Sequence, residues 1–401
     1  MENDREDEKI MFSTQSFCKI GNEIWFVPRN FNALFRMSCA DRRLIYVLEF
    51  EMEPRAKQNL VKGMVHYGNE LWFLPSEAER IYILNLGDKQ MQSLELPAEY
   101  QGNKYKTGAY CADGKYIWVL PFGTVHGFQI DMQEKSTELL PKMSYAENWK
   151  ASYMYCAKLA HKIAAVDNNS GKLMCYDSYL KTADFIVMNK KKGMAQECLV
   201  LSYCDCFYLF SAEKAYLFDS ELKLLEKKSL IAETREMDVL DCLADGDDIW
   251  LSCYPDFILR WNLKDDKVIK FQLEHCQQVR SAAVLGEIGC GVLFQDEEKI
   301  YCLPGDYGYF IEINKKTQEK REFPFGKEFD WIYEYLAADI RNQEARYLFF
   351  NSCVYTLKQY FRCMKQDTAL KRNERQSEKN LRQTGGEVGK AIVDEIISEM
   401  F

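Results

Sequence analysis

The sequence lacks several features that would identify an activity. Only four of its 401 residues are histidines, and none of the four forms an HExxH motif or a pair with zinc-ligand spacing. The chain contains no GxSxG motif, no P-loop and no GxGxxG turn that leads into a helix. We therefore predict no metal, no cofactor and no catalytic residue from motifs.

Long apolar runs and a basic excess are also missing. No run reaches the roughly eighteen residues of a membrane-spanning helix, and the N-terminal stretch MENDREDEKI lacks the apolar core of a secretion signal. The formal net charge of −9 argues against a nucleic-acid partner. The 15 cysteines follow no framework spacing, and their odd number is typical of a reducing compartment. We therefore expect a cytoplasmic protein with no membrane or nucleic-acid partner.

What the sequence does contain is a repeat of seven units. Each unit has an apolar–aromatic segment and, eight to ten residues after it, a short polar residue that closes a second apolar run. The segments are IWFVP (Ile24–Pro28), LWFLP (Leu71–Pro75), IWVLP (Ile117–Pro121), IAAVD (Ile163–Asp167), FYLFS (Phe207–Ser211), IWLSC (Ile249–Cys253) and IYCLP (Ile300–Pro304). The closing residues, spaced 42 to 52 positions apart, are Ser38, Asn85, Asp131, Asp177, Asp219, Asn262 and Asn314.

Each unit is predicted to form four short strands. The aromatic segment is the second strand, and the run that closes at Asn or Asp is the third. Asn and Asp suit the following turn because their side chains bond the backbone just ahead and tolerate a left-handed φ. Four-stranded units with a period in the forties are typical of β-propellers. The predicted fold class is therefore all-β, a seven-bladed β-propeller with a C-terminal α-helical extension.

The expected domain boundaries follow from this pattern. Residues 1–10 form a flexible N-terminus, residues 11–325 form the propeller, and residues 326–401 form a helical tail. The tail segments DWIYEYLAADIR and YTLKQYFRCMKQ carry apolar residues three or four positions apart, which is helical spacing. The last segment, GKAIVDEIISEMF, either packs under the propeller or docks into a groove of a partner. A long stretch at 279–299 leaves six or eight blades as alternatives.

The units resemble the propeller repeats of kelch, quinoprotein-like and YVTN-type proteins. The closest matches to their "hydrophobic-x-hydrophobic-Asp-x-x-Thr/Ser" hairpin are FQIDMQEKST, MCYDSYLKT and FIEINKKTQ, and the resemblance extends roughly from Phe12 to Phe325. It implies a propeller architecture. The double glycine of kelch blades and the Trp-Asp dipeptide of WD repeats are absent, so the resemblance identifies no specific family.

Long connections between units indicate a binding face, because loops on a rigid scaffold carry function. In propellers these connections share one face with the loops between the second and third strands. Basic residues recur near the predicted start of the innermost strand, and Glu236 takes the matching position in one unit. If the register holds, these positive charges converge at the channel mouth and favour an anionic ligand such as a phosphate, a carboxylated sugar or an acidic peptide. The candidate ligand-binding residues are Lys62, Lys106, Lys150, Arg280, Arg235, Glu236, Tyr105, Trp149 and His126. In the alternative interpretation each lysine pairs with a neighbouring acid.

Two other groups of residues receive a structural interpretation. Cys204 and Cys206 are expected on one face of a strand, as packing thiols rather than a metal or redox pair. The paired acids Asp247-Asp248, Asp265-Asp266 and Glu297-Glu298 are expected in solvated hairpin turns.

The favoured hypothesis is a monomeric, non-enzymatic interaction scaffold that binds a protein or peptide on the long-loop face. A second hypothesis is a carbohydrate-active propeller enzyme of the glycosidase or lyase type. The candidates for its acid and base are Glu236 and either Asp167 or Asp306. A third is a small-molecule sensor that signals through the helical tail. Fold alone does not separate these hypotheses, because function depends on sites added to a common fold.

Overall fold

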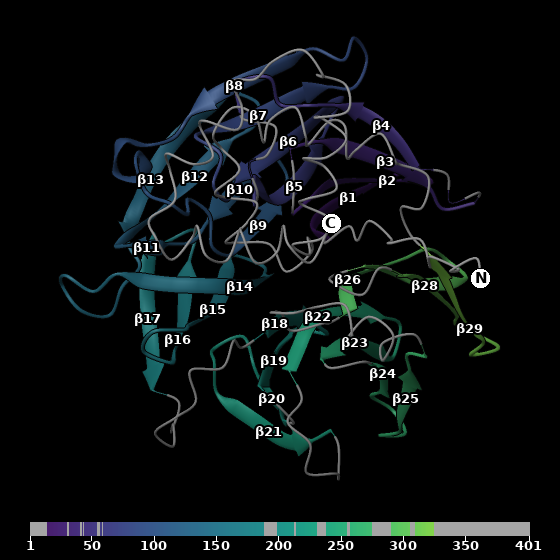
Figure 1. Cartoon of the computed structure of the whole chain (residues 1–401). Coiled ribbons are helices and arrows are strands. Elements are labelled where there is room, and N and C mark those ends of the chain that lie inside the picture. Colours follow the sequence, from purple (N-terminus) through teal and green to yellow (C-terminus); the bar gives the residue numbers. More distant parts are fainter. Residues whose placement is uncertain are drawn as a thin grey trace, which may run out of the picture.

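The chain forms seven antiparallel sheets arranged as blades around a common centre (Figure 1). The computed structural model describes residues 14–29, 32–40, 42, 44–53, 57, 59–187, 199–211, 214–230, 238–254, 257–274, 290–304 and 309–324. These residues include no helix that is long and apolar enough to cross a membrane. The predicted flexible N-terminus (1–10) and helical tail (326–401) lie outside the described residues.

The first four blades contain strands β1 to β17. Blade 1 consists of β1 (Thr14–Ile20), β2 (Glu23–Pro28), β3 (Leu34–Ser38) and β4 (Leu44–Leu48). Blade 2 consists of β5 (Val61–Tyr67), β6 (Glu70–Pro75), β7 (Arg80–Asn85) and β8 (Met91–Glu95). Blade 3 consists of β9 (Tyr110–Asp113), β10 (Tyr116–Val119), β12 (His126–Asp131) and β13 (Ser136–Lys142). Blade 4 consists of β14 (Ala151–Leu159), β15 (Lys162–Asp167), β16 (Lys172–Asp177) and β17 (Thr182–Val187), joined by β11 (Phe122–Thr124).

The last three blades contain strands β18 to β29. Blade 5 consists of β18 (Leu199–Tyr203), β19 (Cys206–Ser211), β20 (Lys214–Phe218) and β21 (Leu224–Ser229). Blade 6 consists of β22 (Asp238–Asp245), β23 (Asp248–Tyr254), β24 (Phe257–Asn262) and β25 (Val268–Gln272). Blade 7 consists of β26 (Cys290–Gln295), β27 (Lys299–Pro304), β28 (Tyr309–Asn314) and β29 (Lys320–Pro324). The predicted seven-bladed propeller is confirmed.

The turns between third and fourth strands explain the recurring Asn and Asp. The side chain of Asn85, for example, accepts hydrogen bonds from the amides of Gly87 (2.8 Å) and Asp88 (3.3 Å). Asp131, Asp177, Asp219, Asn262 and Asn314 accept equivalent bonds from amides ahead of them. The left-handed backbone, however, does not fall on the Asn or Asp. It falls four residues later in most turns, as at Lys89 with φ of 62°.

Blade 4 departs from the predicted four strands. Part of the loop that follows β10 forms β11, where Phe122 pairs with Ser152 and Thr124 with Ala151. This pairing uses the inner edge of β14, which would otherwise present unpaired backbone groups. The sheet of blade 4 therefore has five strands, and one of them comes from the blade 3 segment of the chain.

The structure places Cys204 and Cys206 differently from the prediction. Cys204 and Asp205 both have positive φ, at 48° and 58°, and they form the turn between β18 and β19, whose ends pair as Tyr203 and Cys206. Cys204 therefore lies within a tight turn and Cys206 directly after it, so the prediction that the two thiols share one face of a strand was wrong. The sequence did not indicate this turn because Cys204-Asp205 lacks the Asn-Gly or Asp-Gly pair typical of two-residue hairpins.

The core is divided into seven clusters of buried side chains, one between each pair of neighbouring blades. The cluster between blades 7 and 1 closes the ring. There Phe294 lies 5.7 Å from Phe17 and 4.9 Å from Tyr301, measured between ring centroids. Blade 1 takes all its strands from the beginning of the described chain and blade 7 all its strands from the end. No described strand is shared between these two blades, and within the described residues they are joined by side-chain packing.

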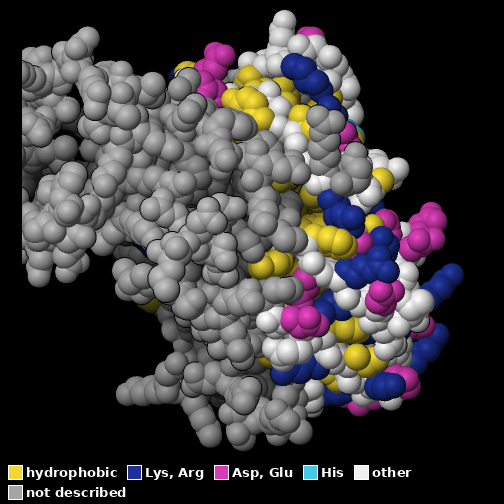
Figure 2. Space-filling model, turned by 45° about the vertical axis from the view of Figure 1, so that its right-hand side comes forward, with side chains coloured by type: hydrophobic (Ala, Val, Ile, Leu, Met, Phe, Trp, Pro, Cys, Tyr) yellow, Lys and Arg dark blue, Asp and Glu magenta, His cyan; other side chains and the backbone are white. Residues whose placement is uncertain are grey.

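A cation from one blade also contacts the next blade at every junction. Lys135, for example, lies 2.6 Å from Glu70 and joins blades 3 and 2. The other contacts are Lys89 over the Trp25 ring, Lys158–Asp113, Lys162–Glu221, Lys228–Asp266, Lys315–Asp245 and Arg42–Glu312. On the part of the surface that Figure 2 colours by type, basic and acidic side chains lie intermixed.

Candidate functional site

The antiparallel strand order places the connections between blades on the same face as the loops between second and third strands. We call it the long-loop face. Its described segments include residues 96–109, 120–125 and 143–150. The short hairpin turns lie on the opposite face, the short-turn face. Extra chain length is therefore concentrated on one side of blades 2 to 4.

The segment 96–109 is anchored by a buried tyrosine. Tyr100 closes a 3-10 turn (Ala98–Tyr100), is fully buried, and donates its hydroxyl hydrogen to the backbone carbonyl of His126. The Thr124 hydroxyl donates to Tyr100 at 3.2 Å. Burial raises the pKa of Tyr100, so the phenol stays protonated and remains a donor. The imidazole Nδ1 of His126 itself lies 3.0 Å from the carbonyl oxygen of Leu140, inside its own blade.

The segment 143–150 is anchored by Asp167 at the end of β15. Its carboxylate accepts from the Trp149 indole at 2.8 Å, the Ser152 amide at 2.9 Å and the Ser170 hydroxyl at 2.5 Å. The amides of Asn169 and Ser170, each at 3.2 Å, complete the set of donors. Asp167 is only 1% exposed, and both carboxylate oxygens are engaged. This carboxylate therefore holds the loop in place. Trp149, one of the candidate ligand-binding residues, is bound to the end of β15 in this way.

The lysines occupy three different environments. Lys106 is 1% exposed, and its ammonium lies 2.9 Å from Glu79. Lys150 is exposed and directly precedes β14. Lys62 lies within β5, with its ammonium 5.8 Å from the ring centroid of Tyr155 in blade 4. The pairing of Lys106 matches the alternative interpretation of that residue, whereas a ligand role for Lys62 and Lys150 stays a prediction.

Tyr105 is an exposed aromatic residue of this face. Its side chain is 37% exposed, its ring packs edge-on against Phe122 at 5.8 Å, and the Lys104 ammonium lies 5.1 Å from its centroid. Arg235, Glu236, Arg280 and Asp306 lie outside the described residues, so their predicted roles stay predictions.

The centre of the ring holds residues that the sequence analysis missed. Burial raises the pKa of Tyr110, and the titratable groups that affect it are Cys18, Cys156 and Asp241, from blades 1, 4 and 6. Its ring lies against Gly63, in the innermost strand of blade 2, where an added methyl group would be 2.1 Å from it. Burial also raises the pKa of Asp241 to about 6, against the lowering effect of hydrogen bonds from the amides of Leu293 (2.7 Å) and Cys242. The sequence feature that could have indicated this site is the acid Asp241 inside the innermost strand of blade 6.

Gly108 fixes how closely blades 3 and 4 approach on the long-loop face. A methyl group at this position would lie 2.2 Å from the carbonyl oxygen of Tyr153, which already accepts from the Ala109 amide at 2.6 Å. Because backbone must move, Gly108→Ala is expected to lower the free energy of unfolding by about 1–3 kcal/mol. Urea unfolding measures this change.

Gly87→Ala is the matched control for Gly108→Ala. Its added methyl would meet only the side chains of Asn69 and Asn85, at 3.1 and 3.2 Å, and these can shift. Equal stability of the two variants would contradict the close approach at Gly108.

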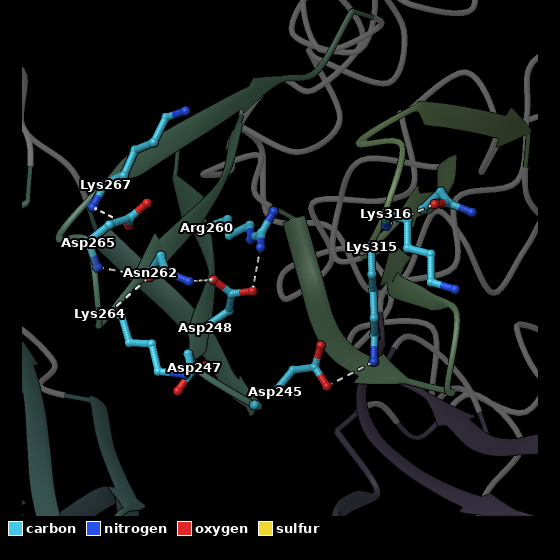
Figure 3. Close-up of polar contacts among 12 residues, drawn as sticks. Asp245, Asp247, Asp248, Arg260, Asn262, Lys264, Asp265, Lys267, Lys315 and Lys316 are labelled. Atoms are coloured by element: carbon cyan, nitrogen blue, oxygen red, sulfur yellow. Dashed lines mark hydrogen bonds and ion pairs between the residues drawn. The ribbon is translucent and has the colours of Figure 1, made fainter.

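The paired acids of the short-turn face have structural partners (Figure 3). Asp248 binds Arg260 at 2.6 Å and Asn262 at 2.8 Å, and Asp247 lies 2.6 Å from Lys264. Asp247, Asp265 and Asp266 lie in the turns of blade 6, as predicted, whereas Asp248 is the first residue of β23 and its carboxylate is mostly buried. Among the described residues, no three His, Cys, Asp or Glu side chains are grouped in a way that could hold a metal ion.

Comparisons with known proteins support the fold. No family model and no curated protein matches the chain. Among solved structures, a catalytically inactive virginiamycin B lyase from Staphylococcus aureus in complex with quinupristin matches with a TM-score of 0.57 at 9% identity, covering 74% of this chain and 94% of the lyase. PorZ, a surface component of the type-IX secretion system of Porphyromonas gingivalis, matches with a TM-score of 0.55 at 11% identity, covering 80% of this chain and 39% of PorZ. At such identities the similarity establishes the fold alone.

Proposed function

We propose that this protein is a non-enzymatic scaffold that binds a protein or peptide on its long-loop face. The observation that supports the proposal most strongly is the anchoring of the long connections. Tyr100 and Asp167 fix segments 96–109 and 143–150 through buried hydrogen bonds. A surface ordered before binding loses less conformational entropy when a partner docks, which favours affinity.

The composition of this face suits a polypeptide partner. The exposed ring of Tyr105 and the ammonium of Lys104 lie together, and Lys150 is exposed on the neighbouring connection. Aromatic residues are enriched among the side chains that contribute most to protein interfaces. The lysines favour a partner segment that carries acidic side chains.

The test is capture of partners from a lysate of the native host with three forms of the full chain. The double variant Tyr105→Ala, Lys150→Ala is expected to lose the partner that the unchanged protein captures, by tenfold or more, which corresponds to about 1.4 kcal/mol. The matched double variant Tyr179→Ala, Lys264→Ala alters the short-turn face, where these side chains are 85% and 76% exposed. It is expected to retain the partner. The reverse pattern would reject the long-loop face as the binding surface.

A further inference from the structure

A pocket lies between the facing sides of blades 5 and 6, with a volume of about 170 Å³. It is separate from the long connections discussed above. Its walls combine two aromatic rings, an aliphatic floor and three charged side chains. The lining residues are Tyr208, Ala215, Leu217, Glu226, Lys228, Trp261, Leu263 and Asp266.

Strand pairing explains why charged side chains face this pocket. Ala215 of β20 pairs with Lys228 of β21, and Leu217 pairs with Glu226. Because side chains alternate along a strand, Glu226 and Lys228 lie on the same side of β21, toward blade 6. The edge strand of blade 5 therefore presents both charges to the pocket.

Blade 6 supplies the aromatic wall and a second carboxylate. The Trp261 ring lies 6.1 Å from the Tyr208 ring in an edge-on arrangement, and its indole N–H donates to Asp266 at 3.1 Å. The Lys228 ammonium lies 4.7 Å from the centroid of Trp261 and forms an ion pair with Asp266. Lys228 therefore occupies the indole face and the adjacent carboxylate, and Glu226 supplies the second negative charge of the pocket.

The charges of the pocket do not balance. Glu226 and Asp266 contribute two negative charges, and Lys228 contributes one positive charge. The Lys228 side chain is only 15% exposed, and burial lowers its pKa. One further monovalent cation would neutralise the pocket, whereas an anion would meet two carboxylates.

We propose that this pocket binds a guanidinium group, presented by an arginine side chain of a partner protein. Because Lys228 already covers the Trp261 indole and pairs with Asp266, the guanidinium would pair with the exposed carboxylate of Glu226. The partner is favoured over a free small cation because Leu224 and Leu225, on the same edge strand, are 50% and 53% exposed. These leucines offer apolar contact to residues that flank the arginine.

The experiment titrates the full chain with Nα-acetylarginine amide and, in parallel, with Nα-acetylcitrulline amide, which has nearly the same shape but no charge. The readout is the NMR resonance of the Trp261 indole N–H, because that group borders the pocket. We expect the arginine compound to shift this resonance at millimolar concentration and the citrulline compound to leave it unchanged. Equal responses, or no response to either compound, would overturn the proposal.

Charge variants sharpen the test. Glu226→Gln is expected to weaken binding of the arginine compound about three- to tenfold, and Lys228→Met to strengthen it by a similar factor, because each changes the charge around the cation. Glu221→Gln is the control, since Glu221 lies in the same blade but pairs with Lys162 of blade 4. If Lys228→Met fails to fold, the Glu226→Gln and Glu221→Gln pair decides the result. Equal affinity of that pair for the arginine compound would overturn the proposal.

A second titration distinguishes the source of the guanidinium. A short peptide with one arginine flanked by leucines is compared with Nα-acetylarginine amide. Tighter binding of the peptide supports a protein partner that also contacts Leu224 and Leu225. Equal binding would overturn the assignment to a protein and indicate a free small cation.

Discussion

Replacing Phe294 by alanine is expected to lower the free energy of unfolding by about 3–5 kcal/mol, the range typical of large aromatic deletions in a core. Phe294 is 4% exposed and contacts Phe17 of blade 1 as well as Tyr301 and Phe310 of its own blade. No described strand crosses between blades 7 and 1, so the aromatic packing has no hydrogen-bonded sheet to support it there. Urea unfolding measures the loss.

Phe128→Ala provides a matched comparison for Phe294→Ala. Phe128 is fully buried between blades 2 and 3, away from the closure of the ring. Hydrogen exchange after Phe294→Ala is expected to rise first in β1 and β26, whereas after Phe128→Ala it should rise first in blades 2 and 3. A loss below about 1 kcal/mol for Phe294→Ala would contradict a ring closed by these side chains.

Replacing Asp241 by asparagine is expected to stabilise the protein at pH 8 by about 2–3 kcal/mol. The folded-state pKa is about 6, above the ordinary value of 3.8, because burial disfavours the charged carboxylate. The native state therefore holds this proton more tightly than the unfolded state. The free energy of unfolding of the unchanged protein therefore falls as pH rises from about 4 to about 6. Above that range Asp241 causes no further fall. Asparagine removes the buried charge while its carbonyl still accepts from Leu293.

The stabilisation by Asp241→Asn should disappear below pH 4, where the aspartate is protonated in both states. Burial and the Asp241 charge both raise the pKa values of Tyr110 and Cys242, so neither of these groups titrates in this window. Thermal unfolding between pH 4 and pH 8 measures the difference. A stability difference that does not change with pH would show that the burial of the Asp241 charge is not its cause.

The fold was predictable because its signals are local and repeated. The aromatic second strand and the closing Asn or Asp recur seven times, and each follows from strand alternation or turn chemistry. Asn85 illustrates this, since the bonds from its side chain to the next amides need only nearby residues. The predicted four strands per blade were wrong for blade 4, because β11, from the blade 3 segment of the chain, pairs with the edge of β14.

The candidate site was less predictable because it depends on contacts between distant segments. The sequence indicated Lys106 as a candidate ligand-binding charge, but its ammonium forms an ion pair with Glu79, from an earlier loop. Asp167 reads as a possible acid, yet Trp149 and Ser152 bind its oxygens. Asp241 stands out only as an acid inside an innermost strand, and its position at the centre of the ring cannot be inferred from that strand alone.

The proposed scaffold function is tested most directly by hydrogen exchange of the full chain with and without a captured partner. Binding on the long-loop face predicts slower exchange in residues 96–109 and 143–150, with the short turns such as 178–181 unchanged. Slower exchange confined to the short turns, with the long connections unaffected, would contradict the assignment of the binding surface.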